Sequence, residues 1–319
     1  MGNLGVMRQF CCFSWPLPSR NSKVGTFGLR SIVLTDHGKG LMITTLGVLF
    51  VVPDSLFIRM IDASAWTVTF WRGIISGLIV LFVIGIFKGR KPFVDSFRTG
   101  YAGLIYTCLI AISAPCFVLA IKLTSVANVV LIIASMPVFA AFFSRFFLDE
   151  AITHRMIYTV LGVFLGLALV AYGSSVNQQA SWQGDLIAVL VSISFAGAMT
   201  AARKLKAVSM VPAIPVSYVL GALLVAPFAT PYSAIVDQPF LILLHGGFIA
   251  CASVLLTLGP RYIGSAEVAL LILLETVLAP LLVWAVMGEY PGQWAVYGGI
   301  IVVGVLVFSN LWQLRAKTM

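Results

Sequence analysis

Uncharged or nearly uncharged runs recur along the whole chain. An α-helix needs about 20 apolar residues to cross the hydrocarbon core of a bilayer, and these runs have that length. The pattern therefore predicts an all-α polytopic membrane protein with ten transmembrane helices. The expected spans are residues 40–60, 66–87, 100–121, 125–148, 154–172, 184–203, 212–232, 238–260, 265–287 and 292–314.

Composition excludes a soluble globular protein. The 319 residues are 60% hydrophobic and 10% charged, and the mean hydropathy is +1.04. Ordinary soluble domains are about 45–50% apolar and about 25% charged. Long apolar runs of this kind are the mark of membrane helices, whereas the strands of a membrane β-barrel alternate over about ten residues.

Positive charge predicts the orientation. Most of the 20 Lys and Arg residues fall in connections on the side of the N-terminus, and only Arg59, Arg72 and Lys122 fall on the opposite side or at its margin. Cytosolic loops of membrane proteins carry the excess of Lys and Arg. We therefore expect both termini in the cytosol and a bacterial inner membrane as the location. The formal charge of +9 is a topology signal, and no nucleic-acid partner is expected.

Residues 1–39 form the expected N-terminal tail. They are rich in basic and small polar residues and carry one acid, Asp36, so we expect a disordered cytosolic segment. A transit peptide and a start codon placed too far upstream are alternatives, and lipidation at Gly2 is disfavoured because Val6 replaces the expected Ser or Thr. Whether this segment belongs to the mature protein stays open.

Two parts of the chain resemble each other. The stretch 122–150 aligns with 261–289, and both copies run from a basic residue through small residues to a terminal Glu, at Glu150 and Glu289. Residues 40–172 and 184–314 then form two repeats of five spans. Because five is odd, the second repeat inserts upside down relative to the first. Inverted repeats are typical of carriers that work by alternating access.

The chain resembles the ten-helix EamA-like family of the drug/metabolite transporter superfamily. The residues that carry this resemblance are "PDSLFIR" (53–59), "TFWRG" (69–73), "MPVFAAFFSRFFLDE" (136–150) and "ETVLAPLLVWAVMGE" (275–289). The resemblance covers residues 40–314 and implies a central cavity between the repeats. One departure is Thr276, which stands where the family often has proline, although Pro280 follows four residues later. The resemblance therefore implies a helix break that is displaced or softened here.

Asp54 and Arg72 are the first candidate site. Asp54 lies about 21 Å along its helix, and Arg72 lies at the same depth on the next, antiparallel helix. An acid inside hydrocarbon is tolerated far better when it has such a partner. The pair could be a fixed bridge between two helices, or it could line the outer half of the cavity. A zwitterionic solute would suit the second role only if the two groups do not satisfy each other.

Glu275 and His245 are the other candidates for substrate binding or coupling. Glu275 lies within an apolar run with no basic residue nearby in sequence. Burial disfavours a charged carboxylate, so this residue could take up and release a proton. His245 falls at about the depth of Asp54 and could relay protons. Hydrogen-bonded packing is the alternative for both residues.

Weaker candidates are polar residues that could line the cavity, although Ser and Thr also bond to their own helix. They are Ser113, Asn128, Ser192, Ser194 and Tyr218. No catalytic motif, nucleotide-binding glycine loop or zinc-binding spacing is present, so we expect neither an enzyme nor a cofactor or metal.

The expected function is secondary active transport of a small metabolite by alternating access, with the lipid bilayer and a solute as partners and protons as a candidate coupling ion. Export of amino acids or related metabolites is the leading hypothesis, chiefly because of the resemblance. Uptake of a vitamin-like or nucleotide-like solute, such as a flavin, is the alternative, and a membrane scaffold without transport is a further one. The sequence leaves the oligomeric state open.

Overall fold

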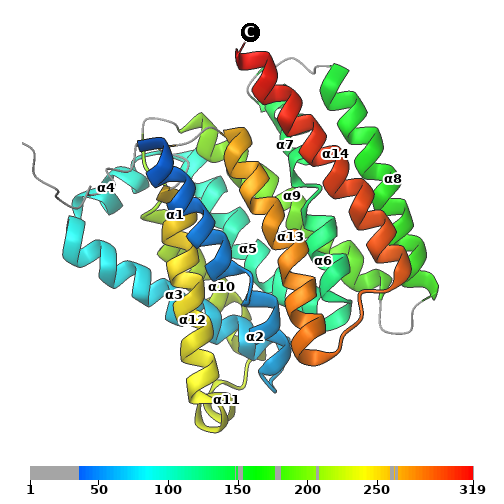
Figure 1. Cartoon of the computed structure of the whole chain (residues 1–319). Coiled ribbons are helices and arrows are strands. Elements are labelled where there is room, and N and C mark those ends of the chain that lie inside the picture. The colour runs from blue at the N-terminus through cyan, green and yellow to red at the C-terminus, as the bar shows by residue number, and fades with distance from the viewer. Residues whose placement is uncertain are drawn as a thin grey trace, which may run out of the picture. The chain divides into compact units, whose positions relative to one another are not determined.

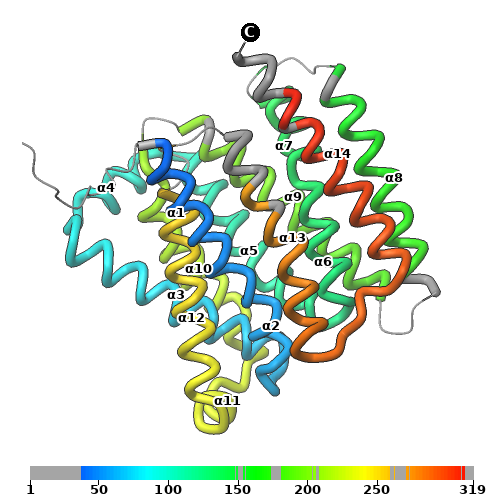
Figure 2. Tube along the Cα trace, in the orientation of Figure 1, coloured from blue at the N-terminus to red at the C-terminus, as the bar shows by residue number. Residues whose placement is uncertain are grey.

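The computed structural model describes residues 36–147, 149, 154–176, 181–205, 208–258, 262 and 265–318 (Figures 1 and 2). Every regular element in these ranges is a helix. The helices are α1 (Asp36–Val51), α2 (Asp54–Met60), α3 (Ala65–Lys88), α4 (Lys91–Phe97), α5 (Tyr101–Leu123), α6 (Val126–Ile133), α7 (Met136–Phe147), α8 (His154–Val176), α9 (Trp182–Lys204), α10 (Ala213–Val225), the 3-10 helix η1 (Ala226–Phe228), α11 (Pro231–Asp237), α12 (Pro239–Leu258), α13 (Ser265–Met287) and α14 (Gln293–Thr318).

Length and apolar composition show a polytopic membrane protein. Among the described residues, seven helical segments are long and apolar enough to cross a membrane, and an eighth is added if the bent pair of α10–η1 and α11 counts as one span. Each of the eight coincides with an expected span. The last two expected spans coincide with α13 and α14, whose apolar described parts, Leu274–Met287 and Gln293–Ser309, are shorter. Most of the expected tail, residues 1–35, lies outside the described residues.

The first span is interrupted at Pro53. The segment ends as α1 at Val51 and restarts as α2 at Asp54. Proline has no N–H, so the carbonyl of Leu49 loses its usual helical partner. The chain keeps the helical course on either side, because the Val52 N–H bonds to Val48 and the Phe57 N–H bonds to the Pro53 carbonyl. Asp54 thereby becomes the first residue of a new, short helix.

Two other expected spans are interrupted. The span at 125–148 divides into α6 and α7 at residues 134 and 135, just before Pro137. The span at 212–232 ends as α10 at Val225, continues through η1 with Pro227, and turns by 105° into α11 at Pro231. Proline removes a backbone donor in each case, and these interruptions were not predicted. In α13, by contrast, the helix is continuous through Thr276 and Pro280, so the displaced or softened break that the resemblance implied does not interrupt this helix.

Helices that lie far apart in the sequence pack as pairs. The closest partners are α5 with α9, α8 with α14, α3 with α10 and α1 with α12 (Figures 1 and 2). Glycine permits two of these contacts. A Cβ on Gly73 of α3 would lie 2.6 Å from the Tyr218 carbonyl of α10, and a Cβ on Gly166 of α8 would lie 2.5 Å from Val302 of α14. Both glycines therefore serve close contacts between helices within the chain.

Candidate functional site

The structure brings Asp54 and Arg72 together in the interior. The Asp54 side chain is 3% exposed and the Arg72 side chain is 11% exposed. Arg72 donates from Nε to Asp54 Oδ1 at 3.1 Å and from an Nη to Oδ2 at 2.7 Å. This two-bond arrangement is the strong form of the Arg–carboxylate pair. The two residues satisfy each other, which removes the condition under which a zwitterionic solute would bind to both.

His245 joins this pair from α12. Its Nε2 lies 2.6 Å from Asp54 Oδ1, and its side chain is 1% exposed. An ionised carboxylate only accepts hydrogen bonds, so the interaction places a proton on Nε2. The imidazole packs against Phe57, with ring centroids 5.5 Å apart. We call Asp54, Arg72 and His245 the interior triad. The sequence predicted a similar depth for the three residues, and the structure brings them into direct contact.

Arg72 also faces an aromatic ring and two further polar groups. Its guanidinium carbon lies 5.8 Å from the centroid of Phe117 on α5, within the range of a cation–π interaction. Tyr218 on α10 and Glu275 on α13 both interact with it electrostatically. Arg72 therefore stands where helices of the first and second parts of the chain converge.

Glu275 lies beside the interior triad without joining it. The residue is partly buried, and it interacts electrostatically with Asp54 and Arg72. Among the described residues it makes no hydrogen bond or ion pair. The Asp54 and Arg72 charges compensate each other, so Glu275 is the carboxyl of this region that has no direct cationic partner within the described chain.

Tyr218, one of the weaker candidates, connects two helices of the second part of the chain. Its hydroxyl is 2.7 Å from the Ser253 hydroxyl, which connects α10 with α12. Ser253 in turn donates to the Ile249 carbonyl of its own helix. Tyr218 is partly buried and interacts electrostatically with Arg72, so its position is compatible with contact to a solute.

The other serine candidates have partners or positions within the helix bundle. Ser113 donates to the Ile110 carbonyl of its own helix at 2.9 Å, the local bond that Ser commonly makes. Ser192 on α9 lies 3.2 Å from Ser135, in the break between α6 and α7. Ser194 is buried in α9. The structure does not bring these three into the interior triad.

A second polar cluster lies at the end of the bundle where α2 ends, and sequence reasoning did not predict it. Arg59 Nε lies 3.0 Å from Glu289 Oε2, and Arg59 also donates to the Thr124 carbonyl at 2.7 Å. Glu289 Oε1 accepts the Val126 N–H at 2.9 Å. Glu289 was interpreted only as the charged end of a helix. The structure instead places it in an ion pair that spans 230 residues of sequence.

The same cluster continues through Thr124 to α9. Thr124 Oγ1 donates to Asp185 Oδ1 at 2.9 Å, and Asn128 Nδ2 lies 3.3 Å from the same oxygen. The Ser181 N–H donates to Thr124 Oγ1. We call Arg59, Thr124, Val126, Asn128, Ser181, Asp185 and Glu289 the end cluster. The sequence contained one indication of this cluster: Arg59 is one of the three basic residues that fall on the side opposite the N-terminus or at its margin.

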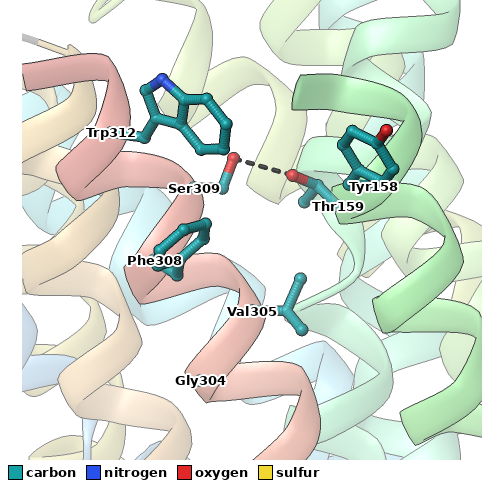
Figure 3. Close-up of a pocket in the computed structure, with 7 residues that line it drawn as sticks. All are labelled: Tyr158, Thr159, Gly304, Val305, Phe308, Ser309 and Trp312. Carbon is teal, nitrogen blue, oxygen red and sulfur yellow. Dashed lines mark hydrogen bonds between the residues drawn. The ribbon is translucent and has the colours of Figure 1, made fainter. Parts of the chain in front are cut away.

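Two pockets lie elsewhere, and neither is lined by a candidate residue. One, of about 250 Å³, lies between α8 and α14, where Thr159 donates to Ser309 at 2.8 Å (Figure 3). The other lies between α3 and α4. Among the described residues no group of His, Cys, Asp and Glu could hold a metal ion.

Comparison with known proteins gives the family. Residues 38–172 match the model of the EamA-like transporter family. The chain also matches a crystal structure of another protein at 17% sequence identity and a TM-score of 0.56, over 88% of this chain and 99% of that one. That likeness shows a shared fold. No curated protein matches. The resemblance noted in the sequence is thus confirmed for residues 38–172, the part of this integral, multi-pass membrane protein that matches the EamA-like transporter family of the drug/metabolite transporter superfamily.

Proposed function

We propose that the protein is a secondary active transporter that moves a small metabolite across the membrane by alternating access. Export of amino acids or related metabolites is the leading assignment. The observation that carries the proposal is the interior triad, in which α2 and α3 of the first half meet α12 of the second half through buried charge. Charged groups inside a membrane protein are expensive and usually mark a solute or ion pathway.

The packing of the helices supports an inverted repeat of five spans. The proposed halves are α1 to α8 and α9 to α14, with α1–α2, α6–α7 and α10–α11 each counted as one span. Suppose that each span of one half is exchanged for the corresponding span of the other half. The pair α5–α9 then becomes α12–α1, and the pair α3–α12 becomes α10–α5. The pairs α3–α10, α8–α14 and α6–α13 are each converted into themselves. All of these contacts occur. These larger pairings are unchanged by the exchange, which is what two related halves around a pseudo-twofold axis produce.

The end cluster supports alternating access as the mechanism. Its contacts join the proposed halves: Arg59 to Glu289, Val126 to Glu289, and Thr124 to Asp185. A solute site at the centre can open to one side only when the opposite side is held shut. We assign the end cluster as the closure on the outer side, since the distribution of positive charges favours both termini in the cytosol.

Uptake of an aromatic, vitamin-like or nucleotide-like solute is the second candidate. Phe117 and Tyr218 beside Arg72 favour it, because aromatic side chains and an arginine stack on planar rings. Both assignments use the same part of the bundle and differ in the solute.

A ligand screen tests the proposal. Purified protein in detergent would be heated with amino acids, polyamines, nucleosides, flavins and lipophilic cations. A ligand present at 100 times its dissociation constant stabilises the native state by about 2.7 kcal/mol. We expect one chemical class to raise the midpoint and to be moved by proteoliposomes that contain the protein, but not by empty liposomes. No shift in any class, together with no flux, would contradict transport of these solutes.

A further inference from the structure

A long apolar groove lies between the second half of α3 and the short helix α4. Its volume is about 990 Å³, and of the twelve residues that line it Arg90 alone is charged. Exposed side chains form the walls: Phe82 is 70% exposed, Ile86 61% and Phe97 71%. In Figure 1, α3 and α4 form the elbow on the left.

The elbow follows from local sequence. Gly89 ends α3 with φ 66° and ψ −156°, a conformation that favours glycine, and its N–H bonds to the Gly85 carbonyl. Pro92 lies in the first turn of α4, where the missing N–H has no helical partner to lose. Phe93 then packs against the buried cluster that includes Val80 and Ile84 of α3. The groove is therefore a built feature of the fold.

Basic side chains surround the mouth of this groove. Lys88, Arg90, Lys91 and Arg98 are exposed, and Asp95 is the single acid between residues 88 and 98. Among the described residues none of the four makes an ion pair. Basic clusters next to a membrane helix attract anionic lipid headgroups, and basic pockets between helices bind them as individual molecules.

We propose that this groove binds one anionic phospholipid. Its acyl chain lies along the apolar walls, and its phosphate lies at Arg90 with the neighbouring lysines. Charge complementarity selects the occupant: an apolar groove alone accepts any acyl chain, whereas the basic mouth favours a headgroup with net negative charge. The proposal does not depend on what the protein transports.

The pocket between α8 and α14 provides an internal comparison. It is also lined by apolar and aromatic side chains, but it holds no Lys or Arg: its lining is Tyr158, Thr159, Gly304, Val305, Phe308, Ser309 and Trp312 (Figure 3). This pocket is therefore not expected to prefer lipids with an anionic headgroup.

Two glycines allow each groove to be filled separately. A Cβ on Gly85, in the α3–α4 groove, meets no atom within 4 Å, and the same is true of Gly304 in the other pocket. Gly85→Leu therefore adds a side chain at the proposed site where its Cβ has open space, and it removes no charge. Gly304→Leu is the matched control, since it makes the same change in a helix of the same protein.

Native mass spectrometry with added phosphatidylglycerol or phosphatidylcholine of identical acyl chains tests the proposal. One basic residue near a membrane surface contributes about fivefold in affinity for anionic lipid. We expect wild-type protein to bind one phosphatidylglycerol at least fivefold more tightly than phosphatidylcholine. Arg90→Gln should reduce this preference about fivefold, Gly85→Leu should abolish the site, and Gly304→Leu should retain it.

Two results would overturn the site. Equal affinity of wild-type protein for the two lipids would remove the role of the basic mouth. Undiminished preference for phosphatidylglycerol in Gly85→Leu would show that surface charge alone recruits the lipid and that the groove takes no part.

Discussion

The interior triad and the end cluster both join the two proposed halves through charge, but their surroundings differ. The side chains of the triad are between 1% and 11% exposed, whereas Arg59 and Glu289 are 23% and 17% exposed. In the triad one carboxylate receives every donor. In the end cluster the bonds are shared with backbone groups at Thr124 and Val126.

This difference indicates which region can open. When a deeply buried ion pair separates, each charge loses its partner and gains no water, so separation costs much free energy. When a partly exposed ion pair separates, water replaces the lost partner of each residue, so the cost is small. The end cluster is thus suited to break and re-form during a transport cycle. The contacts of the triad are suited to persist, or to separate only when other charged or polar groups replace them.

The largest loss of stability is expected for Asp54→Asn. The change leaves Arg72 in the interior without a counter-charge, which costs about 3–5 kcal/mol. Denaturant unfolding in mixed micelles would measure it, with Asp149→Asn as a control, since that side chain is 96% exposed and its pair with Arg145 is 3.9 Å long. If Asp54→Asn unfolds at the same midpoint denaturant concentration as the wild type, the variant does not leave Arg72 buried without a counter-charge.

A double variant separates the two interpretations of this pair. Asp54→Leu combined with Arg72→Met removes both charges, and the stability should largely return. If the pair belongs to the solute pathway, as we propose, flux into proteoliposomes stays absent. Recovery of flux together with stability would make the pair a fixed bridge.

A smaller loss is expected for Gly246→Ala, next to His245. The new Cβ would lie 2.4 Å from Ile75 Cγ2, so α12 would be pushed away from α3, at about 1–3 kcal/mol. Gly247→Ala is the neighbouring control, because its Cβ meets no atom within 4 Å. The same unfolding assay compares them. Equal stability of the two variants would show that the α3–α12 contact is looser than described.

Arg59→Gln should have a modest effect on stability, at about 1 kcal/mol or less, and a larger effect on access. Ser125 is 2% exposed beneath the cluster, so Ser125→Cys should react slowly with a membrane-impermeant maleimide in protein otherwise free of cysteine. Arg59→Gln should accelerate the reaction, and the exchange Arg59→Glu with Glu289→Arg should slow it again. An unchanged rate in Arg59→Gln would argue against closure by this pair.

Glu275→Gln should change stability least. Glu275 makes no hydrogen bond or ion pair within the described chain, so the isosteric amide should shift unfolding by no more than about 0.5 kcal/mol. We expect loss of transport driven by a pH difference, with solute exchange intact. Uphill accumulation by the variant on a pH difference alone would exclude Glu275 as the coupling group.

Sequence predicted the membrane helices well because the bilayer imposes one requirement on every span. Each backbone polar group must be satisfied within its own helix over a fixed thickness, and long apolar runs report this. The interruptions before Pro137 and after Val225 were not predicted, since a proline within an apolar run is compatible with a kink, a break or a continuous helix. Pro280, inside unbroken α13, shows the third outcome.

The pairing of Asp54 with Arg72 was predictable from the sequence, but the contacts between the more distant parts of the chain were not. Counting residues along antiparallel helices placed Asp54, Arg72 and His245 at one level. It could not place Glu289 against Arg59, because their separation of 230 residues is bridged only by the arrangement of the halves. Nor could it identify the short helix α4, whose seven residues interrupt a connection that reads as a basic loop.

The turn at residues 124–126 also affects how the topology of this chain can be measured. Topology is often mapped by inserting an epitope into successive loops and asking which insertions are tolerated. Here the Thr124 carbonyl, the Thr124 hydroxyl and the Val126 N–H each bond to a different part of the chain. An epitope at this turn would separate all three, so its rejection would report a junction between distant segments and not depth in the bilayer.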